Sequence, residues 1–145
     1  MDKKMEEDMK KRVKSGWIRS SVMVEAMAIN EKAAKGALEK LIESLSSEEN
    51  IMVYNKEFHE AQKVKKPLPN VEEASSVIVE FDMLTINYDR LLYVVLNYGP
   101  SSIEILEPEH IKMDAGEAQN IANSLAAMIH KIASSQIGGM LMPTS

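Results

Sequence analysis

Cysteine is absent from the sequence, and this excludes disulfide bonds, thiolate metal sites and a cysteine nucleophile. Basic residues are outnumbered by acidic ones, 17 to 22, and the net charge of −5 argues against broad electrostatic attraction to duplex nucleic acid or an anionic membrane. The basic run KVKK at residues 63–66 has no interleaved aromatic residues and indicates a solvated loop. We therefore expect neither a nucleic-acid partner nor a membrane partner.

Long apolar runs are missing as well. No stretch approaches the roughly 18 apolar residues of a membrane-spanning helix, and residues 1–16 lack the apolar core of a signal peptide. These absences favour a cytoplasmic protein. A length of 145 residues suits one domain with a sizeable core, because folded chains of this size bury roughly 70% of their unfolded surface.

Motifs that specify a reaction are also absent: the sequence contains no GxSxG, HExxH, GxxxxGK[ST] or GxGxxG. His59, His110 and His130 have no serine or metal-ligand partner at a diagnostic spacing. Glu107, Glu109 and His110 are compatible with acid–base chemistry or with half a metal site, but a glutamate-rich loop after a strand is common for solubility alone. The sequence therefore favours a non-catalytic protein without a cofactor.

Hydrophobic spacing and capping signals predict four helices. Residues 2–14 form a charged helix with Met5, Met9 and Val13 on one stripe. The later helices are placed by their ends: Asn30 opens one, Asn87 or Asp89 opens the next, Gly99 and Pro100 end it, and Asp114 with Glu117 opens the last. The last helix carries a wide apolar stripe over residues 118–132, which predicts that it is buried against another surface.

Strands are predicted at residues 17–28, 51–64, 75–86 and 102–106, with a proline-containing loop at 65–73. The Lys, Glu and Gln content of 51–64 predicts that it is an edge strand or a protruding hairpin arm. The central order is β-α-β-β-α-β, which predicts an α+β, ferredoxin-like antiparallel sheet with both crossover helices on one face. The 17–28 strand should lie between the 75–86 and 102–106 strands. We expect residues 1–16 to be a separate charged helix, 17–133 a single domain that includes the C-terminal helix, and 134–145 a flexible tail.

Alternation along the strands predicts which side chains face the helices and which face away. The core set is Val22, Val24, Val77, Val79 and Phe81, with Ile103 and Ile105 entering from the fourth strand. The opposite face should then gather the candidate binding residues Met23, Glu25, Met27, Ile78, Glu80, Asp82 and Glu104. Among these, Glu25, Glu80 and Asp82 are also candidate ligands of a divalent metal, because oxygen ligands suit such ions. A solvated face neutralised by Arg19, Lys56 and Lys112 is the simpler alternative.

Apolar residues mixed with carboxylates on an open sheet indicate an interaction surface. We therefore expect a homo-oligomer, most simply a dimer, helped by the wide stripe on residues 118–132 and by eleven methionines. Met5, Met9 and Val13 are a second candidate contact for a protein partner. The expected function is a non-catalytic domain that self-associates and binds a protein or small ligand at its open sheet face or subunit interface. The alternative is a metal-dependent enzyme that uses the carboxylate cluster or the Glu107–His110 loop.

The chain also resembles two known groups. The stretches SSVIVEFDML, DRLLYVVLNYGP, SSIEILEPEHIKM and AQNIANSLAAMIHKI resemble uncharacterised archaeal proteins that carry a similar "PSSIEILEPE" core between two helices, over most of residues 17–133. More loosely, residues 75–115 resemble the ferredoxin-like C-terminal extension of WYL-domain transcriptional regulators, although the DNA-binding and WYL portions have no counterpart here. The resemblances imply a ferredoxin-like fold and an archaeal cytosol, and they assign no activity to particular residues.

Overall fold

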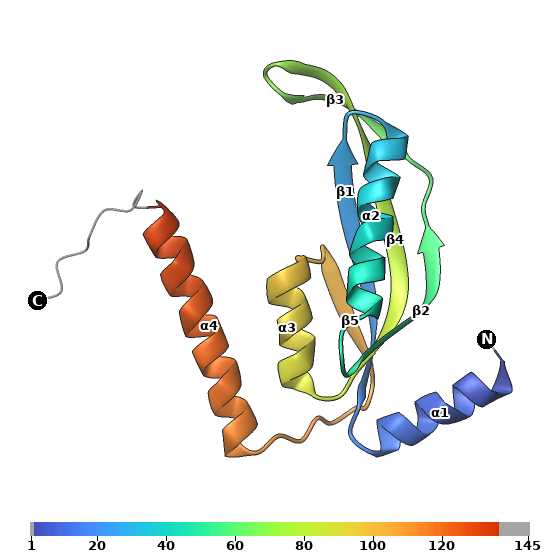
Figure 1. Cartoon of the computed structure of the whole chain (residues 1–145), viewed down its shortest axis with the longest axis vertical. Helices are drawn as coiled ribbons and strands as arrows, with labels where there is room; N and C mark the ends of the chain where they lie inside the picture. Colours follow the sequence, from blue (N-terminus) through green and yellow to red (C-terminus); the bar gives the residue numbers. More distant parts are fainter. Residues whose placement is uncertain (1, 137–145) are drawn as a thin grey trace, which may run out of the picture. The chain divides into compact units, whose positions relative to one another are not determined.

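The computed structural model describes residues 2–136, which Figure 1 traces in chain order. Residues 137–145, the larger part of the predicted flexible tail, lie outside the described residues. The chain divides into two compact units, residues 1–112 and residues 113–145. None of the helices within residues 2–136 is long and apolar enough to cross a membrane.

The first unit holds most of the secondary structure. Its elements are, in order, α1 (Lys3–Lys14), β1 (Ile18–Ala28), α2 (Glu31–Ser46), β2 (Ile51–Phe58), β3 (Gln62–Leu68), β4 (Val71–Thr85), α3 (Tyr88–Tyr98) and β5 (Ser102–Glu107). The second unit holds α4 (Ala115–Gln136), which extends past residue 133 into the range predicted as tail.

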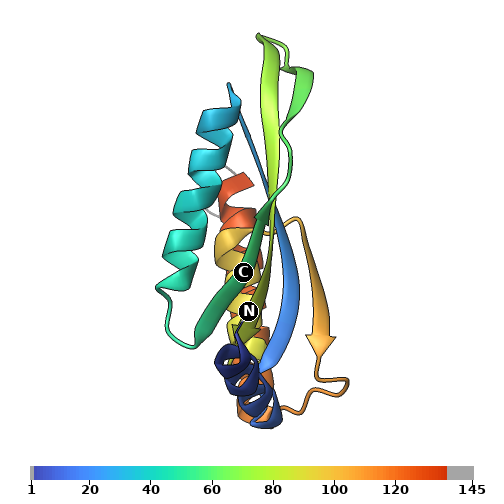
Figure 2. The same cartoon turned by 90° about the vertical axis from the view of Figure 1, so that its right-hand side faces the viewer.

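The five strands form one antiparallel sheet with the order β2-β4-β1-β5, and β3 pairs with the first part of β4. β1 lies between β4 and β5, as the sequence predicts. Seen edge-on in Figure 2, α2 and α3 lie on the same side of the sheet. An α+β architecture with an antiparallel sheet and helices at both ends of the chain is thus confirmed, and the sheet has one strand more than the predicted plan.

Residues 51–73 account for that difference. The predicted single strand at 51–64 and the predicted loop at 65–73 are both wrong, because β2 and β3 are separate strands and β4 begins at Val71. Pro67 is tolerated inside β3 because this strand pairs with β4 alone and the pairing shifts register beside the proline. The β3–β4 hairpin, called the arm below, extends beyond the end of the sheet (Figure 1).

The hydrophobic core lies between the sheet and α2 and α3. All five central strand residues predicted for the core are buried and pack in one cluster with the inner faces of the two helices, namely Ala34, Leu38, Ile42 and Leu45 of α2 and Leu91 and Val94 of α3. Ile103 packs against this cluster as expected. Ile105 does not, since it is 39% exposed on β5, a strand at the edge of the sheet.

The helix ends follow the predicted capping residues. Three side-chain oxygens accept a backbone N–H from the first turn: Asn30 Oδ1 from Ala33 at 2.8 Å, Asn87 Oδ1 from Arg90 at 2.9 Å, and Asp114 Oδ1 from Glu117 at 2.8 Å. Gly99 ends α3 in the left-handed conformation, with φ of 56°. These local signals place the helices correctly without any tertiary information.

Candidate functional site

The side of the sheet opposite α2 and α3, called the open face below, carries all the binding residues predicted for it. In the observed register Ser21 of β1 lies opposite Asp82 of β4 and Glu104 of β5. Met23 lies opposite Glu80 in the same way. Residues directly opposite each other in an antiparallel pair point to the same face. The β1–β4 pairs Glu25 with Ile78 and Met27 with Ser76 extend this surface towards the arm.

Most carboxylates of the open face already have a partner within the chain. The contacts are Ser76 Oγ donating to Glu25 at 2.6 Å, Asn55 Nδ2 donating to Asp82 at 3.1 Å, and His59 Nε2 lying 3.5 Å from Glu80 Oε1. Glu104 has no hydrogen-bond or ion-pair partner among residues 2–136 and is exposed. The four acids therefore do not converge on a common point.

The arrangement does not form a metal-ligand set. Within residues 2–136, no three aspartate, glutamate or histidine side chains gather closely enough to hold a metal ion. Glu25, Glu80 and Asp82 are instead engaged by separate neighbours along β4 and β2. The geometry thus gives no support to the candidate metal site.

Arg19 also lies on this face, where the sequence predicts for it only that it neutralises nearby carboxylates. Its Nε donates to Glu107 Oε2 at 3.0 Å, and its Nη1 lies 3.9 Å from Asp82 Oδ2. Burial lowers the pKa of Arg19, but the hydrogen bond to Glu107 and the nearby Tyr54 outweigh it, and the pKa ends above its ordinary value. Arg19 is therefore a firmly held cation between two carboxylates, those of Glu107 and Asp82.

Tyr54 lies beneath this ionic group and was not anticipated. It pairs with Asp82 across β2 and β4 and is only 6% exposed. Its hydroxyl is buried next to Arg19 without a well-aligned hydrogen bond. Burial raises the pKa of Tyr54, and the carboxylates of Asp82 and Glu107 add to the rise against the opposing effect of Arg19. Because residues directly opposite each other share a face, the pairing of Tyr54 with Asp82 is what could have predicted its place on the open face.

Apolar side chains occupy the middle of the open face and continue to the arm. Met23 and Ile78 are half-buried, and Met27 is 52% exposed. Beyond Met27, an open pocket of about 570 Å³ is lined almost entirely by apolar residues at the base of the arm, including Ile29, at 79% exposure, and Leu68, at 62%. The sequence alone does not reveal this extension, because the prolines at 67 and 69 predict a loop over residues 65–73.

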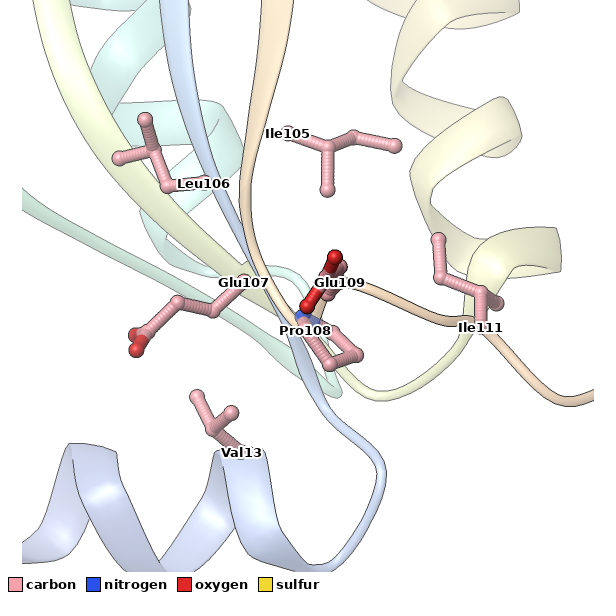
Figure 3. A pocket seen from close by; sticks show the side chains of 7 residues that line it. All are labelled: Val13, Ile105, Leu106, Glu107, Pro108, Glu109 and Ile111. Atoms are coloured by element: carbon pink, nitrogen blue, oxygen red, sulfur yellow. The ribbon is translucent and has the colours of Figure 1, made fainter.

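A second pocket, of about 780 Å³, lies at the end of β5 and is lined by Val13, Ile105, Leu106, Glu107, Pro108, Glu109 and Ile111. Figure 3 shows the Glu107 side chain leaving the strand on the side away from Ile105 and Ile111. Glu107 is engaged by Arg19, and no hydrogen-bond donor side chain lines the pocket. His110 does not line it either, so the predicted Glu107–Glu109–His110 group does not converge on this cavity.

The stripe on α1 is the last of the predicted contacts. Met5 is 43% exposed, whereas Met9 and Val13 are half-buried. Val13 borders the pocket at the end of β5, and Met9 borders a smaller pocket beside Arg19. The stripe is therefore partly used within the first unit, and its role for a protein partner stays a prediction.

A polar network on the opposite, helical side joins the end of α2 to α3. Tyr98 Oη donates to Glu48 Oε2 at 3.0 Å, and Arg90 Nη2 lies 3.7 Å from Glu48 Oε1. Tyr93, whose ring lies 4.2 Å below the Arg90 guanidinium, is the main cause of the lowered pKa of Glu48, with Tyr98 and Arg90 adding to it. This network borders none of the pockets described above and fixes one helix against the other.

Comparison with known proteins identifies the family. The model of the MJ0538 family matches residues 19–142, which is most of the chain, and the chain belongs to that family. No curated protein matches it. The matched region runs from the second residue of β1 through the whole of α4.

Proposed function

We propose that this member of the MJ0538 family is a non-catalytic interaction domain that self-associates and binds a protein partner at its open face. The observation that carries the proposal is the apolar centre of that face, Met23 and Ile78, set among carboxylates on the side of the sheet opposite α2 and α3. An exposed apolar patch rimmed by polar groups is the usual mark of a protein-interaction site.

The charge of the open face indicates what kind of partner it can bind. The open face carries five carboxylates, Glu25, Glu80, Asp82, Glu104 and Glu107, and of these Arg19 contacts only Asp82 and Glu107, so the face is negative. A partner that fits would present an apolar side chain to the centre and lysine or arginine residues around it, because complementary charge speeds association and selects the partner. Glu104, which has no partner within residues 2–136, is the natural contact for such a cation.

The metal-dependent alternative is not proposed. Glu25, Glu80 and Asp82 each have a separate neighbour, and the described residues contain no group of three potential ligands close enough for one ion. Holding a divalent ion would require these side chains to give up those contacts and converge.

The proposal extends to the fold class and the compartment. We place the sheet in the ferredoxin-like class, as a version enlarged by β3, because β1 lies between β4 and β5 and the helices α2 and α3 lie on one face. We also place the protein in an archaeal cytoplasm, as the resemblance of the PSSIEILEPE core implies. The looser resemblance to WYL-domain regulators contributes no function here.

Photo-crosslinking in the native cell tests the proposal. A photoreactive amino acid at Met23 should give a discrete adduct, because Met23 lies at the centre of the proposed contact. The same adduct should disappear in the variant Glu104→Lys, which reverses the charge of an exposed, unpartnered carboxylate on this face. Glu43→Lys is the matched control, since Glu43 is an exposed carboxylate on α2, and it should leave the adduct unchanged. No adduct, or equal loss with both variants, would refute the proposal.

A further inference from the structure

The helix α4 carries an apolar stripe with the spacing of a helix-pairing seam. Ala118, Ile121, Leu125, Met128 and Ile132 alternate at intervals of three and four residues. This interval keeps side chains in line along one edge of a helix and is the pattern by which two helices interlock. Ala122 and Ile129 widen the stripe on one side.

Within the described part of the second unit, no other element covers that stripe. In residues 113–136, α4 is the single helix or strand. Leu125 is 42% exposed, Ile129 67% and Ile132 48%. Because the stability of a helix in a protein comes mainly from packing its apolar face, a helix of 22 residues with this stripe requires a partner surface.

The distribution of charge indicates what that surface is. The helix has an acidic residue, Glu117, in its first turn and a basic residue, Lys131, near its end, and no charged residue lies between them. The two are separated by two heptads and therefore lie on the same flank of the stripe. In an antiparallel pair of identical helices the end that carries Glu117 lies beside the end that carries Lys131 in the other copy, and the helix dipoles oppose each other favourably. A parallel pair would bring like ends together.

We propose that α4 pairs in antiparallel orientation with α4 of a second copy, and that this contact holds the protein as a two-fold dimer. The inference rests on the self-association part of the proposed function and leaves the open face free for another protein. In the register with the longest overlap, Leu125 lies opposite Met128 of the second copy, Ile121 opposite Ile132, and Ala118 opposite Ser135. An isologous contact of this kind closes on itself and gives a dimer rather than a filament.

Mass measurement by light scattering on the full chain is the first test. The unmodified protein should have the mass of two chains. Leu125→Glu should give the mass of one chain, because it places a carboxylate in the seam, while far-ultraviolet circular dichroism should show that the first unit, which has its own core, stays folded. Ala127→Glu is the matched control on the opposite side of α4 and should remain dimeric.

Disulfide crosslinking tests the orientation of the two helices. Because the chain has no native cysteine, every disulfide formed must involve the introduced cysteines. An equimolar mixture of Ala118→Cys and Ser135→Cys proteins should form a mixed disulfide under mild oxidation. Ala118→Cys alone should not, because the two thiols of an antiparallel pair would be about 25 Å apart. Disulfide formation by Ala118→Cys alone would show a parallel pair and overturn the inference.

The outcomes separate this inference from the proposed function. A monomeric unmodified protein would overturn both the α4 contact and self-association. A dimer that persists in Leu125→Glu would overturn the α4 contact alone. A dimer that dissociates in Met23→Glu but persists in Leu125→Glu would place self-association on the open face, against the inference.

Discussion

Replacing Arg19 with glutamine should lower the free energy of unfolding by about 0.7 to 2 kcal/mol. The exposed ion pair with Glu107, at 3.0 Å, accounts for roughly 0.2–1 kcal/mol of this. The rest, roughly 0.5–1 kcal/mol, comes from leaving the half-buried Asp82 with Asn55 as its remaining partner. In a chain of 145 residues, each kcal/mol corresponds to a shift in the melting temperature of roughly 3 to 4 °C.

Urea unfolding followed by circular dichroism at pH 7 measures this effect, and a double-mutant cycle with Glu107→Gln isolates the ion pair. Glu107→Gln alone should cost less than Arg19→Gln, since Glu107 interacts with Arg19 at the exposed edge whereas Arg19 also serves Asp82. The coupling energy between the two substitutions should be about 0.2–1 kcal/mol, decreasing with added salt. If Arg19→Gln were neutral or stabilising, the account of Arg19 as the cation that holds this face together would be refuted.

Three further predictions concern the fold around the site. Glu48→Gln should reduce the loss of folding stability at acid pH. The pKa of Glu48 is lowered in the folded state, chiefly by Tyr93, so its stabilisation is present above the ordinary carboxyl pKa and is lost as the pH falls through the lowered value. Urea unfolding at several pH values measures this difference. Gly99→Ala should cost about 1 kcal/mol of folding stability, because the φ of 56° at Gly99 is left-handed. Gly36→Ala, in the interior of α2 with nothing within 4 Å of the added Cβ, should instead stabilise the fold by about 0.4–1 kcal/mol. Thermal melts in which both changes had the same sign would contradict this. Leu38→Ala should cost about 2–5 kcal/mol in chemical denaturation, since Leu38 is 1% exposed in the core, and a loss below 1 kcal/mol would count against the core described here.

Local chemistry made the helices predictable from sequence. Asn30, Asn87 and Asp114 cap their helices through the expected backbone contacts, and Gly99 ends α3. These interactions involve residues three or four positions apart, so the sequence contains all the information required. The alternation of β1, β4 and β5 was equally local, and it placed all the candidate binding residues on the open face.

Features set by strand pairing were not predictable in the same way. Pro67 predicts a loop when only the sequence is known. Whether a strand tolerates a proline depends on which of its edges is free and where the pairing shifts, and neither is local information. Arg19 meets Glu107 only because the register of β1 and β5 shifts between Arg19 and Ser20. Ile105 was assigned to the core because alternation gives the side of a strand but not its position at the edge of the sheet.

The measurement that tests the central claim most directly is methionine oxidation in native cells, compared with the purified protein. If a partner covers the open face, Met23 and Met27 should be oxidised several-fold more slowly in cells than in the purified chain. Met113, which is 43% exposed in the second unit, serves as the internal reference and should react at similar rates in both. Equal oxidation of Met23 and Met27 in the two samples, relative to Met113, would contradict the account of the open face as an interaction surface.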